Sequence, residues 1–257
     1  MTLDQSLERT LTILARRETV FRFFTDNARW ERWWGQGSTV DPRPGGHVRI
    51  LYPGAVEVVG EVLEIKVPER IAFTYGFTSG SPIPPGSSRV TIDLAEEGLA
   101  TRLTLKHEFS DAKARDEHVQ GWRYQLAIFS NIVSEEVNAK APEMIDAWFE
   151  VWSNGDAAER ARLLEQIATP TVEFRDRYGA TRGSDDLLAH VTAAQHFMPG
   201  IRLERQGDVR QCQGSAFCNW TASKDGKAAG TGTTFFAFDA EGRIQSVNGF
   251  WSQAASG

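Results

Sequence analysis

Several stretches in the first half of the chain alternate between apolar and polar positions. This is the pattern of antiparallel strands with one buried and one wet face. The clearest case is residues 102–109, where His107 shares the inward face with leucine and phenylalanine neighbours. Further strands are predicted at residues 7–14, 48–52, 56–67, 71–77 and 89–95. Within 56–67 the alternation breaks at Val58-Val59-Gly60, which predicts a β-bulge there.

Helical spacing predicts three helices in the same half. Two short ones fall at about 16–25 and 27–34, and a long one at about 113–138. Apolar residues of the long helix recur at i, i+3, i+4 and i+7, and Asp111 is placed to cap its start. Its apolar stripe is wider than that of a surface helix, so we expect this helix to lie across a curved sheet.

The second half begins with helices and ends with strands. Pro142 is tolerated in a first helical turn and so can open the first of these helices. The predicted helices are 142–153, 156–168 and 183–196, with a short strand around Val172 and Phe174 before the last of them. Glycine-containing turns then separate four predicted strands near 201–212, 215–223, 228–239 and 243–252.

These patterns divide the chain into two α+β domains in series. The predicted first domain is 1–138 and the second is 142–257, joined by a linker at 139–141. A length of 257 residues suits two ordinary domains with a core each.

The first domain resembles a known family through an ordered set of short motifs. They are Val20-Phe21-Arg22-Phe23-Phe24, Trp30, Trp33-Trp34, Gly45-Gly46, Pro68-Glu69-Arg70-Ile71, Gly121-Trp122 and Leu126. The set is similar to the Hsp90-ATPase-activator-homologue-like branch of the START/Bet v 1-like (SRPBCC) superfamily. This resemblance implies a helix-grip fold, an antiparallel sheet over a long C-terminal helix, with a cavity for an apolar ligand between them.

The second domain resembles the NTF2-like superfamily, which includes SnoaL-type cyclases and ketosteroid isomerases. The motifs that carry this resemblance are Trp152-Ser153-Asn154-Gly155-Asp156, Thr171-Val172-Glu173-Phe174-Arg175-Asp176, Gly183 and the run 236–244. It implies a cone, a curved antiparallel sheet wrapped around helices. NTF2-like domains often dimerise through the exposed sheet face, and Phe235, Phe250 or Trp251 could serve that role in a homodimer.

Composition narrows the classes of partner. The net charge of −6 argues against nucleic acid, because phosphate binding needs clustered Lys and Arg. The start of the chain has no basic segment followed by an apolar run, and no stretch approaches the roughly 18 apolar residues of a membrane helix. We therefore expect a cytoplasmic protein without a membrane contact. Two cysteines and five histidines show no metal-ligand spacing, so neither a metal nor a cofactor is expected.

Eight tryptophans and fifteen phenylalanines are the unusual feature of the composition. Ordinary core is the default for each one, but so many aromatic rings together favour a pocket for a ring-containing ligand. The candidate ligand-binding residues of the first domain are Trp30, Trp33, Trp34, Tyr75, His107 and Trp122. Those of the second domain are Trp148, Phe174, His196, Trp220 and Thr234.

Asp176 is the candidate catalytic residue. It is in phase with Val172 and Phe174, so it is predicted to face the apolar interior, where a desolvated carboxylate becomes a stronger base. The alternative is that it ends a strand and caps the Tyr178-Gly179 turn. The family resemblance places the proton-shuttling aspartate of ketosteroid isomerases at this position.

The same resemblance places the isomerases' oxyanion-hole tyrosine and second acid near Trp148 and Thr234. These two side chains are weaker donors, which argues against steroid-type isomerisation. His107 is expected to bind a ligand or to be a hydrogen-bonded core histidine, and His196 to reach a pocket mouth or to end a surface helix.

Three functions follow from these features. The leading one is binding of a small apolar, aromatic or polycyclic molecule, with cofactor-free isomerase, cyclase or dehydratase chemistry of the polyketide-cyclase type if Asp176 is a base. The second is a non-catalytic binding protein or sensor. The third is an Hsp90-type co-chaperone, for which the acidic balance provides no docking patch.

Overall fold

The computed structural model describes residues 2–252. Met1, the first residue of the predicted first domain, and residues 253–257, the last of the predicted second domain, lie outside the described part. Contacts divide the chain into two compact units, Met1–Ser134 and Glu135–Gly257. The boundary falls in the last turn of the long helix.

The first unit is a seven-stranded sheet in the order β1-β7-β6-β5-β4-β3-β2, and every neighbouring pair is antiparallel. Its strands are β1 (Gln5–Ile13), β2 (Thr39–Val40), β3 (His47–Tyr52), β4 (Val56–Lys66), β5 (Arg70–Phe77), β6 (Ser88–Glu97) and β7 (Ala100–Phe109). Only the two-residue β2 was not expected. The α+β fold class is confirmed.

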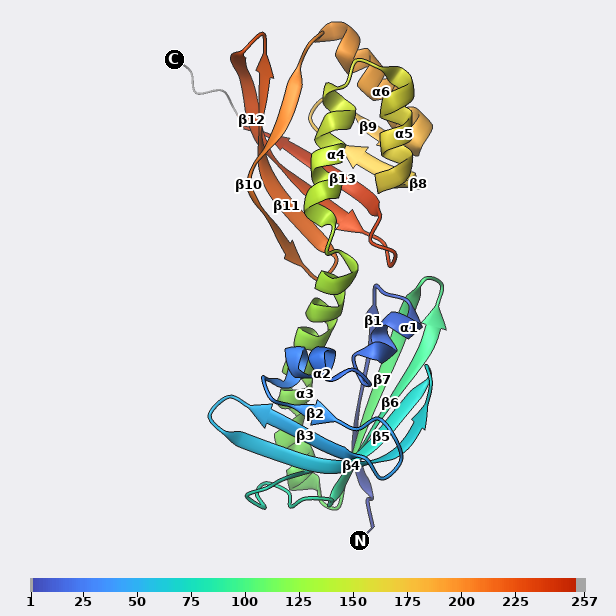
Figure 1. Cartoon of the computed structure of the whole chain (residues 1–257), viewed down its shortest axis with the longest axis vertical. Coiled ribbons are helices and arrows are strands. Elements are labelled where there is room, and N and C mark those ends of the chain that lie inside the picture. The colour runs from blue at the N-terminus through green and yellow to red at the C-terminus, as the bar shows by residue number, and fades with distance from the viewer. Residues whose placement is uncertain (1, 253–257) are drawn as a thin grey trace. The chain divides into compact units, whose positions relative to one another are not determined.

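Three helices complete this unit: α1 (Arg17–Arg22), α2 (Asn27–Trp34) and α3 (Ala112–Val137). The Asp111 carboxylate accepts a hydrogen bond from the Ala114 amide at 2.9 Å, so the predicted cap of α3 is present. The α3 helix lies along one face of the sheet (Figure 1, green) and meets it through ring contacts such as Tyr75 with Trp122. This is the helix-grip arrangement that the wide apolar stripe predicts. Tyr124 of α3 lies outside this buried face, since 69% of it is exposed.

The break in β4 does not produce a bulge at Val58-Val59-Gly60. Gly60 is in regular register with Val48, and the shift of register against β5 comes later, between Val62 and Glu64. A Cβ atom on Gly60 would lie 1.7 Å from the Thr74 carbonyl oxygen. The glycine therefore permits a close approach of two strands, which produces the same local sequence signal as a bulge.

The second unit has a six-stranded sheet in the order β10-β11-β12-β13-β8-β9. Its strands are β8 (Ala168–Arg175), β9 (Ala180–Arg182), β10 (Arg202–Cys212), β11 (Ser215–Lys224), β12 (Lys227–Phe238) and β13 (Ile244–Trp251). All neighbours are antiparallel except β13 and β8, which run parallel. The parallel pair joins the last strand of the chain to the first strand after the helices.

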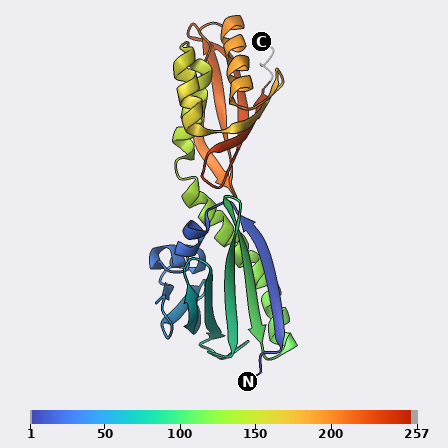
Figure 2. The ribbon, with the colours of Figure 1, turned by 90° about the vertical axis from the view of Figure 1, so that its right-hand side faces the viewer.

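Three helices cover one face of this sheet: α4 (Ala141–Ser153), α5 (Ala157–Ile167) and α6 (Ser184–Phe197), as Figure 2 shows in its upper part. Pro142 lies in the first turn of α4, as predicted. The core lies between α4 and the sheet, where Trp148 and Phe236 meet edge to face with ring centroids 6.0 Å apart. Alternate residues of the strands face away from this core, among them Phe235, which is 46% exposed.

No helix in the described part of the chain is both long and apolar enough to cross a membrane.

Candidate functional site

A hollow of about 320 Å³ opens between α3 and the sheet of the first unit. Ligand sites for small molecules have volumes of roughly 300–1,000 Å³, so the hollow is large enough for a small ring system. Most of its wall is aromatic or apolar: Tyr52, Val56, Tyr75, Phe77, Pro82 and Trp122. Glu117, His118 and Gln125 of α3 add polar groups to this wall.

Two tyrosine hydroxyls meet in this hollow. The oxygens of Tyr52 and Tyr75 are 3.1 Å apart, so one hydroxyl donates a hydrogen bond to the other. Desolvation by burial raises the pKa of Tyr75 to about 12, and burial with the neighbouring phenol raises the pKa of Tyr52 well above 10. Both phenols therefore stay protonated at neutral pH. The hydrogen bond between the two phenols uses only one of their two hydroxyl protons, so the other O–H can donate to a ligand.

His118 offers the complementary group. Its Nδ1 lies 2.7 Å from the Ala114 carbonyl oxygen, which can only accept, so Nδ1 carries the proton. Burial lowers the pKa of His118, and the ring is neutral at pH 7. Nε2 is then a bare acceptor, and it is buried without a hydrogen-bond partner in the part of the chain that the structure describes. Buried polar atoms rarely stay unpaired, so this nitrogen marks a position for a donor.

His107 lies next to the hollow, but both of its ring nitrogens are hydrogen-bonded within the protein. Trp122 Nε1 donates to its Nδ1 at 2.8 Å, and its Nε2 then carries the proton and lies 2.8 Å from Ser88 Oγ. Ser88 Oγ in turn donates a hydrogen bond to the Tyr75 carbonyl oxygen, also at 2.8 Å. Burial and the nearby His118 hold the pKa of His107 well below 6.5. These bonds favour the alternative of a hydrogen-bonded core histidine.

The three tryptophans of α2 belong to the core beside the hollow. Trp30 and Trp33 donate to the carbonyl oxygens of Arg49 and Phe23, each at 3.3 Å. Trp34 comes closest to the hollow, because its ring lies 5.7 Å from both Tyr52 and Trp122, centroid to centroid. Of the six candidates in the first domain, only Tyr75 and Trp122 line the hollow.

The second unit has a much smaller internal space, about 30 Å³, which is roughly the share of one water molecule in the liquid. The candidates gathered around it are Asp176, Trp148, Phe174, Trp220 and Thr234. Aromatic rings fill the rest of this interior. Gly232 makes room for one of them, since a Cβ atom there would lie 2.3 Å from Cζ2 of Trp220.

Asp176 caps the turn and also borders the small internal space. Its Oδ1 accepts hydrogen bonds from the amides of Tyr178 and Gly179 at 2.7 and 2.9 Å, which caps the turn. Its Oδ2 accepts from Trp251 Nε1 at 3.1 Å, on the side of the small internal space. The carboxylate is thus held by three donors. Trp220 belongs to the wall of the same space, and its Nε1 is buried with no hydrogen-bond partner within residues 2–252.

His196 lies apart from these residues. It is exposed in the last turn of α6, beside Phe197, and borders a groove on the outer side of the helices. The structure brings together five of the six second-domain candidates and leaves His196 outside their group.

Sequence reasoning missed His118 and Tyr52. A usable signal existed for His118, which precedes Trp122 by four residues and so shares its face of α3. Tyr52 ends β3, and nothing in its local pattern pointed to a partner more than twenty residues away.

Comparisons with known proteins agree with this architecture. Residues 14–134 match the family model described as activator of Hsp90 ATPase homolog 1-like protein, and residues 145–247 match the SnoaL-like domain. The chain therefore consists of an Hsp90-ATPase-activator-homologue-like domain followed by a SnoaL-like domain, as the sequence motifs predict. Both kinds of domain fit a ligand-binding role or an isomerase or cyclase role. No curated protein matches the chain.

Among solved structures, a putative isomerase of the SnoaL-like family from Agrobacterium tumefaciens is 23% identical, with a TM-score of 0.43, over 44% of this chain and 98% of its own. CalU16 from Micromonospora echinospora is 26% identical, with a TM-score of 0.42, over 54% of this chain and 82% of its own. Protein Ms6760 from Mycobacterium smegmatis is 22% identical, with a TM-score of 0.45, over 54% of this chain and 95% of its own.

Proposed function

We propose that the first domain binds a small aromatic or polycyclic molecule that carries a hydroxyl group, in the hollow between α3 and the sheet. The observation that carries this proposal is the unpaired Nε2 of His118, a residue that lines an aromatic-walled space of about 320 Å³. An apolar wall binds the ring system through burial, and a few polar groups set its orientation.

The polar groups favour a phenol or a hydroxylated ring over a pure hydrocarbon. Nε2 of His118 accepts the ligand's O–H, and the free proton of the Tyr52–Tyr75 pair is available to the ligand's oxygen. A ligand without a donor would leave Nε2 unpaired, which costs about 1–3 kcal/mol for a buried polar atom.

A matched pair of probes tests this proposal. Isothermal titration of the full chain with 2-naphthol and with 2-methoxynaphthalene compares a donor with a nearly isosteric non-donor. We expect 2-naphthol to bind about tenfold more tightly, and His118→Phe to abolish that preference while the ether still binds. Equal affinity of the wild-type chain for the two probes, or binding of neither, would reject the phenol site.

The second domain supports a second proposal, which is proton transfer with Asp176 as the base. The observation that favours it is the convergence of Asp176, Trp148 and Thr234 on one internal space, beside the unpaired Trp220 N–H. That space holds about one water, so Trp251 has to swing away from Asp176 before a substrate enters. Asp176→Asn keeps the turn-capping oxygen and removes the base.

Activity discriminates between an enzyme and a sensor. Native mass spectrometry of the purified chain identifies a retained molecule, which is then incubated with the wild-type chain and with Asp176→Asn. Turnover by the wild-type chain that the substitution abolishes supports proton transfer. Turnover that survives removes Asp176 from the mechanism, and a retained ligand that is never converted favours a binding protein or sensor.

A further inference from the structure

The described part of the second unit buries a positive charge for which it supplies no counter-ion. Arg160 on α5 is only 3% exposed. Its Nη1 donates to the Asn154 carbonyl oxygen and its Nη2 to Thr192 Oγ1, both at 2.9 Å. Both acceptors are neutral, and Nε is buried without a partner among the described residues. No carboxylate within residues 2–252 forms an ion pair with this guanidinium.

An arginine keeps its charge under all physiological conditions, so it cannot avoid the free-energy cost of burying that charge by losing a proton. A desolvated charge is normally paired or bound to an ion. Arg160 also lies near the start of α5, where the partial charge of the helix end is positive and gives a cation no help. The missing negative charge is therefore expected to come from outside the chain.

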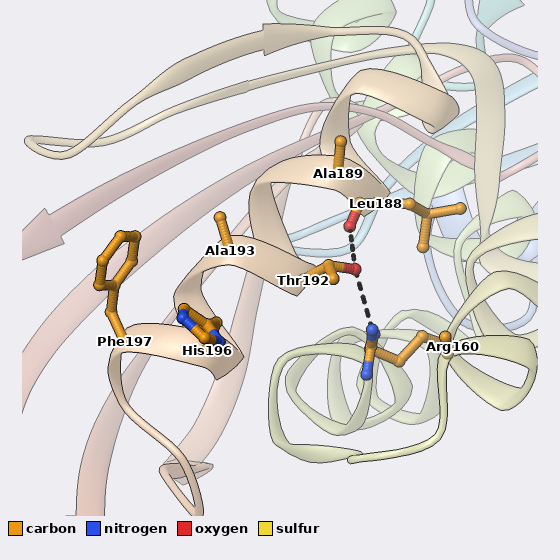
Figure 3. Close-up of a pocket in the computed structure, with 8 residues that line it drawn as sticks. Arg160, Leu188, Ala189, Thr192, Ala193, His196 and Phe197 are labelled. Atoms are coloured by element: carbon orange, nitrogen blue, oxygen red, sulfur yellow. Dashed lines mark hydrogen bonds between the residues drawn. The ribbon is translucent and has the colours of Figure 1, made fainter.

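The surroundings of Arg160 form a place where such a charge could bind. A groove of about 680 Å³ runs along the outer side of α5 and α6, and Arg160 is part of its wall. Figure 3 shows Arg160 reaching from α5 to Thr192, with Ala193 and His196 following on the same helix. The other wall residues are Ala157, Leu188, Ala189 and Phe197, so the wall has no carboxylate.

The guanidinium is held in place before any ligand arrives. Thr192 Oγ1 accepts from Arg160 and in turn donates to the Leu188 carbonyl oxygen at 2.8 Å, which fixes its orientation. Each of these two bonds uses one N–H of the guanidinium, so three of its five N–H groups remain for an acceptor. A preorganised fork of this kind suits a carboxylate oxygen.

We propose that this groove is a binding site for a small organic carboxylate with an alkyl or aryl group. The carboxylate pairs with Arg160, and the apolar group lies on Ala189, Ala193 and Phe197. Phe197 is 80% exposed, so a ligand there covers apolar surface that now faces water. The wall contains no lysine and no second arginine, which favours a single negative charge over a phosphate dianion.

The site is separate from the hollow of the first domain and from Asp176, so it does not depend on either proposal above. The test is an NMR titration of the full chain with 4-phenylbutyrate, with its neutral amide 4-phenylbutanamide as the control. We expect saturable shifts at the amides of Ala189, Thr192 and Ala193 with the acid, and binding by the amide that is about tenfold weaker or absent. Octyl phosphate provides a third arm, and tighter binding of that dianion would overturn the choice of a carboxylate.

Arg160→Gln is the direct variant and is expected to weaken 4-phenylbutyrate by about tenfold or more. Because Arg160 is buried and joins two helices, that variant could fail to fold. A pair of variants at an exposed position therefore provides a second test. Ala193→Glu places a tethered carboxylate on the wall of the same groove, and Ala193→Gln is its neutral match at an exposed helical position. We expect Ala193→Glu to abolish acid binding and to raise the melting temperature above that of Ala193→Gln, which still binds.

Equal shifts by the acid and the amide would overturn the proposal. So would acid binding that survives Ala193→Glu, because the tethered carboxylate would then not compete for Arg160.

Discussion

The indole nitrogen of Trp251 donates a hydrogen bond to Oδ2 of Asp176 over 3.1 Å, and so joins the end of β13 to the residue that follows β8. The two residues are 75 positions apart in the sequence. The indole lies edge to face with the ring of Trp220, 4.7 Å away between centroids. Trp251 therefore ties the turn at Asp176 to the aromatic wall of the second domain.

Removal of this bond is expected to destabilise the second domain. Trp251→Phe keeps a ring but loses the donor to a carboxylate, and we expect a loss of about 1–2 kcal/mol in the free energy of opening. Native-state hydrogen exchange of the β12 amides measures this value. In a double-mutant cycle with Asp176→Asn the two effects should couple, and simple additivity would show that the bond contributes nothing.

The hydrogen-bond chain from Trp122 through His107 to Ser88 predicts a second effect. Ser88→Ala leaves the Nε2–H of His107 and the Tyr75 carbonyl oxygen without their buried partner. We expect a loss of about 1–3 kcal/mol in the stability of the first domain, read from hydrogen exchange in β6 and β7. Ser87→Ala is the control, because water can replace its exposed hydrogen bond to Pro84. Equal losses in the two variants would contradict this account.

The two buried histidines predict an acid-sensitive first domain. The pKa of each lies below 6.5 in the folded state. Below that pH the unfolded chain therefore binds protons that the folded chain does not bind. Their contribution to stability is present above pH 6.5 and is lost as the pH falls. The slope is at most about 1.4 kcal/mol per pH unit for each histidine.

Hydrogen exchange of β7 at pH 7.5 and pH 5.5, corrected for intrinsic rates, measures this loss. His118→Gln should reduce it, since only His107 then titrates between the two states. The same stability at both pH values would mean that neither histidine is held neutral by burial.

The outward face of the second sheet carries a row of aromatic side chains on β11, β12 and β13. Phe235 lies between Phe217 and Phe250, with ring centroids 5.3 and 5.8 Å away. Phe235 is 46% and Phe250 is 57% exposed. We propose that this row is the contact between two copies of the chain, because association would remove an apolar surface from water.

Phe235→Lys places a charge at the centre of that row and is expected to convert a dimer into a monomer in sedimentation velocity runs at micromolar concentration. Phe197→Lys, at the end of α6, provides a control at a more exposed phenylalanine that should leave the dimer intact. A wild-type chain that sediments as a monomer at these concentrations would reject the contact.

The sequence by itself determined nearly all of the helices and strands and their order. The reason is local: alternation and helical spacing record which face of each segment is buried, and capping residues such as Asp111 mark where a helix starts. The same local pattern led to the wrong prediction of a bulge at Gly60, because a close strand contact and a bulge both require a residue without a side chain. It also could not show that β13 pairs with β8, since pairing between distant strands leaves no local pattern.

Only the tertiary structure decided which aromatic residues surround a space and which fill one. Trp30 and Trp122 have similar helical patterns, yet Trp30 is core and Trp122 lines the hollow of the first domain. The difference depends on how closely α3 approaches the sheet, which is a property of both elements together. For the same reason, the unpaired nitrogen of His118, the Trp251 bond to Asp176 and the charge of Arg160 without a counter-ion emerge only when distant segments meet. Hydrogen bonding and burial are decided by neighbours in space, and a linear sequence names those neighbours only when they are also close along the chain.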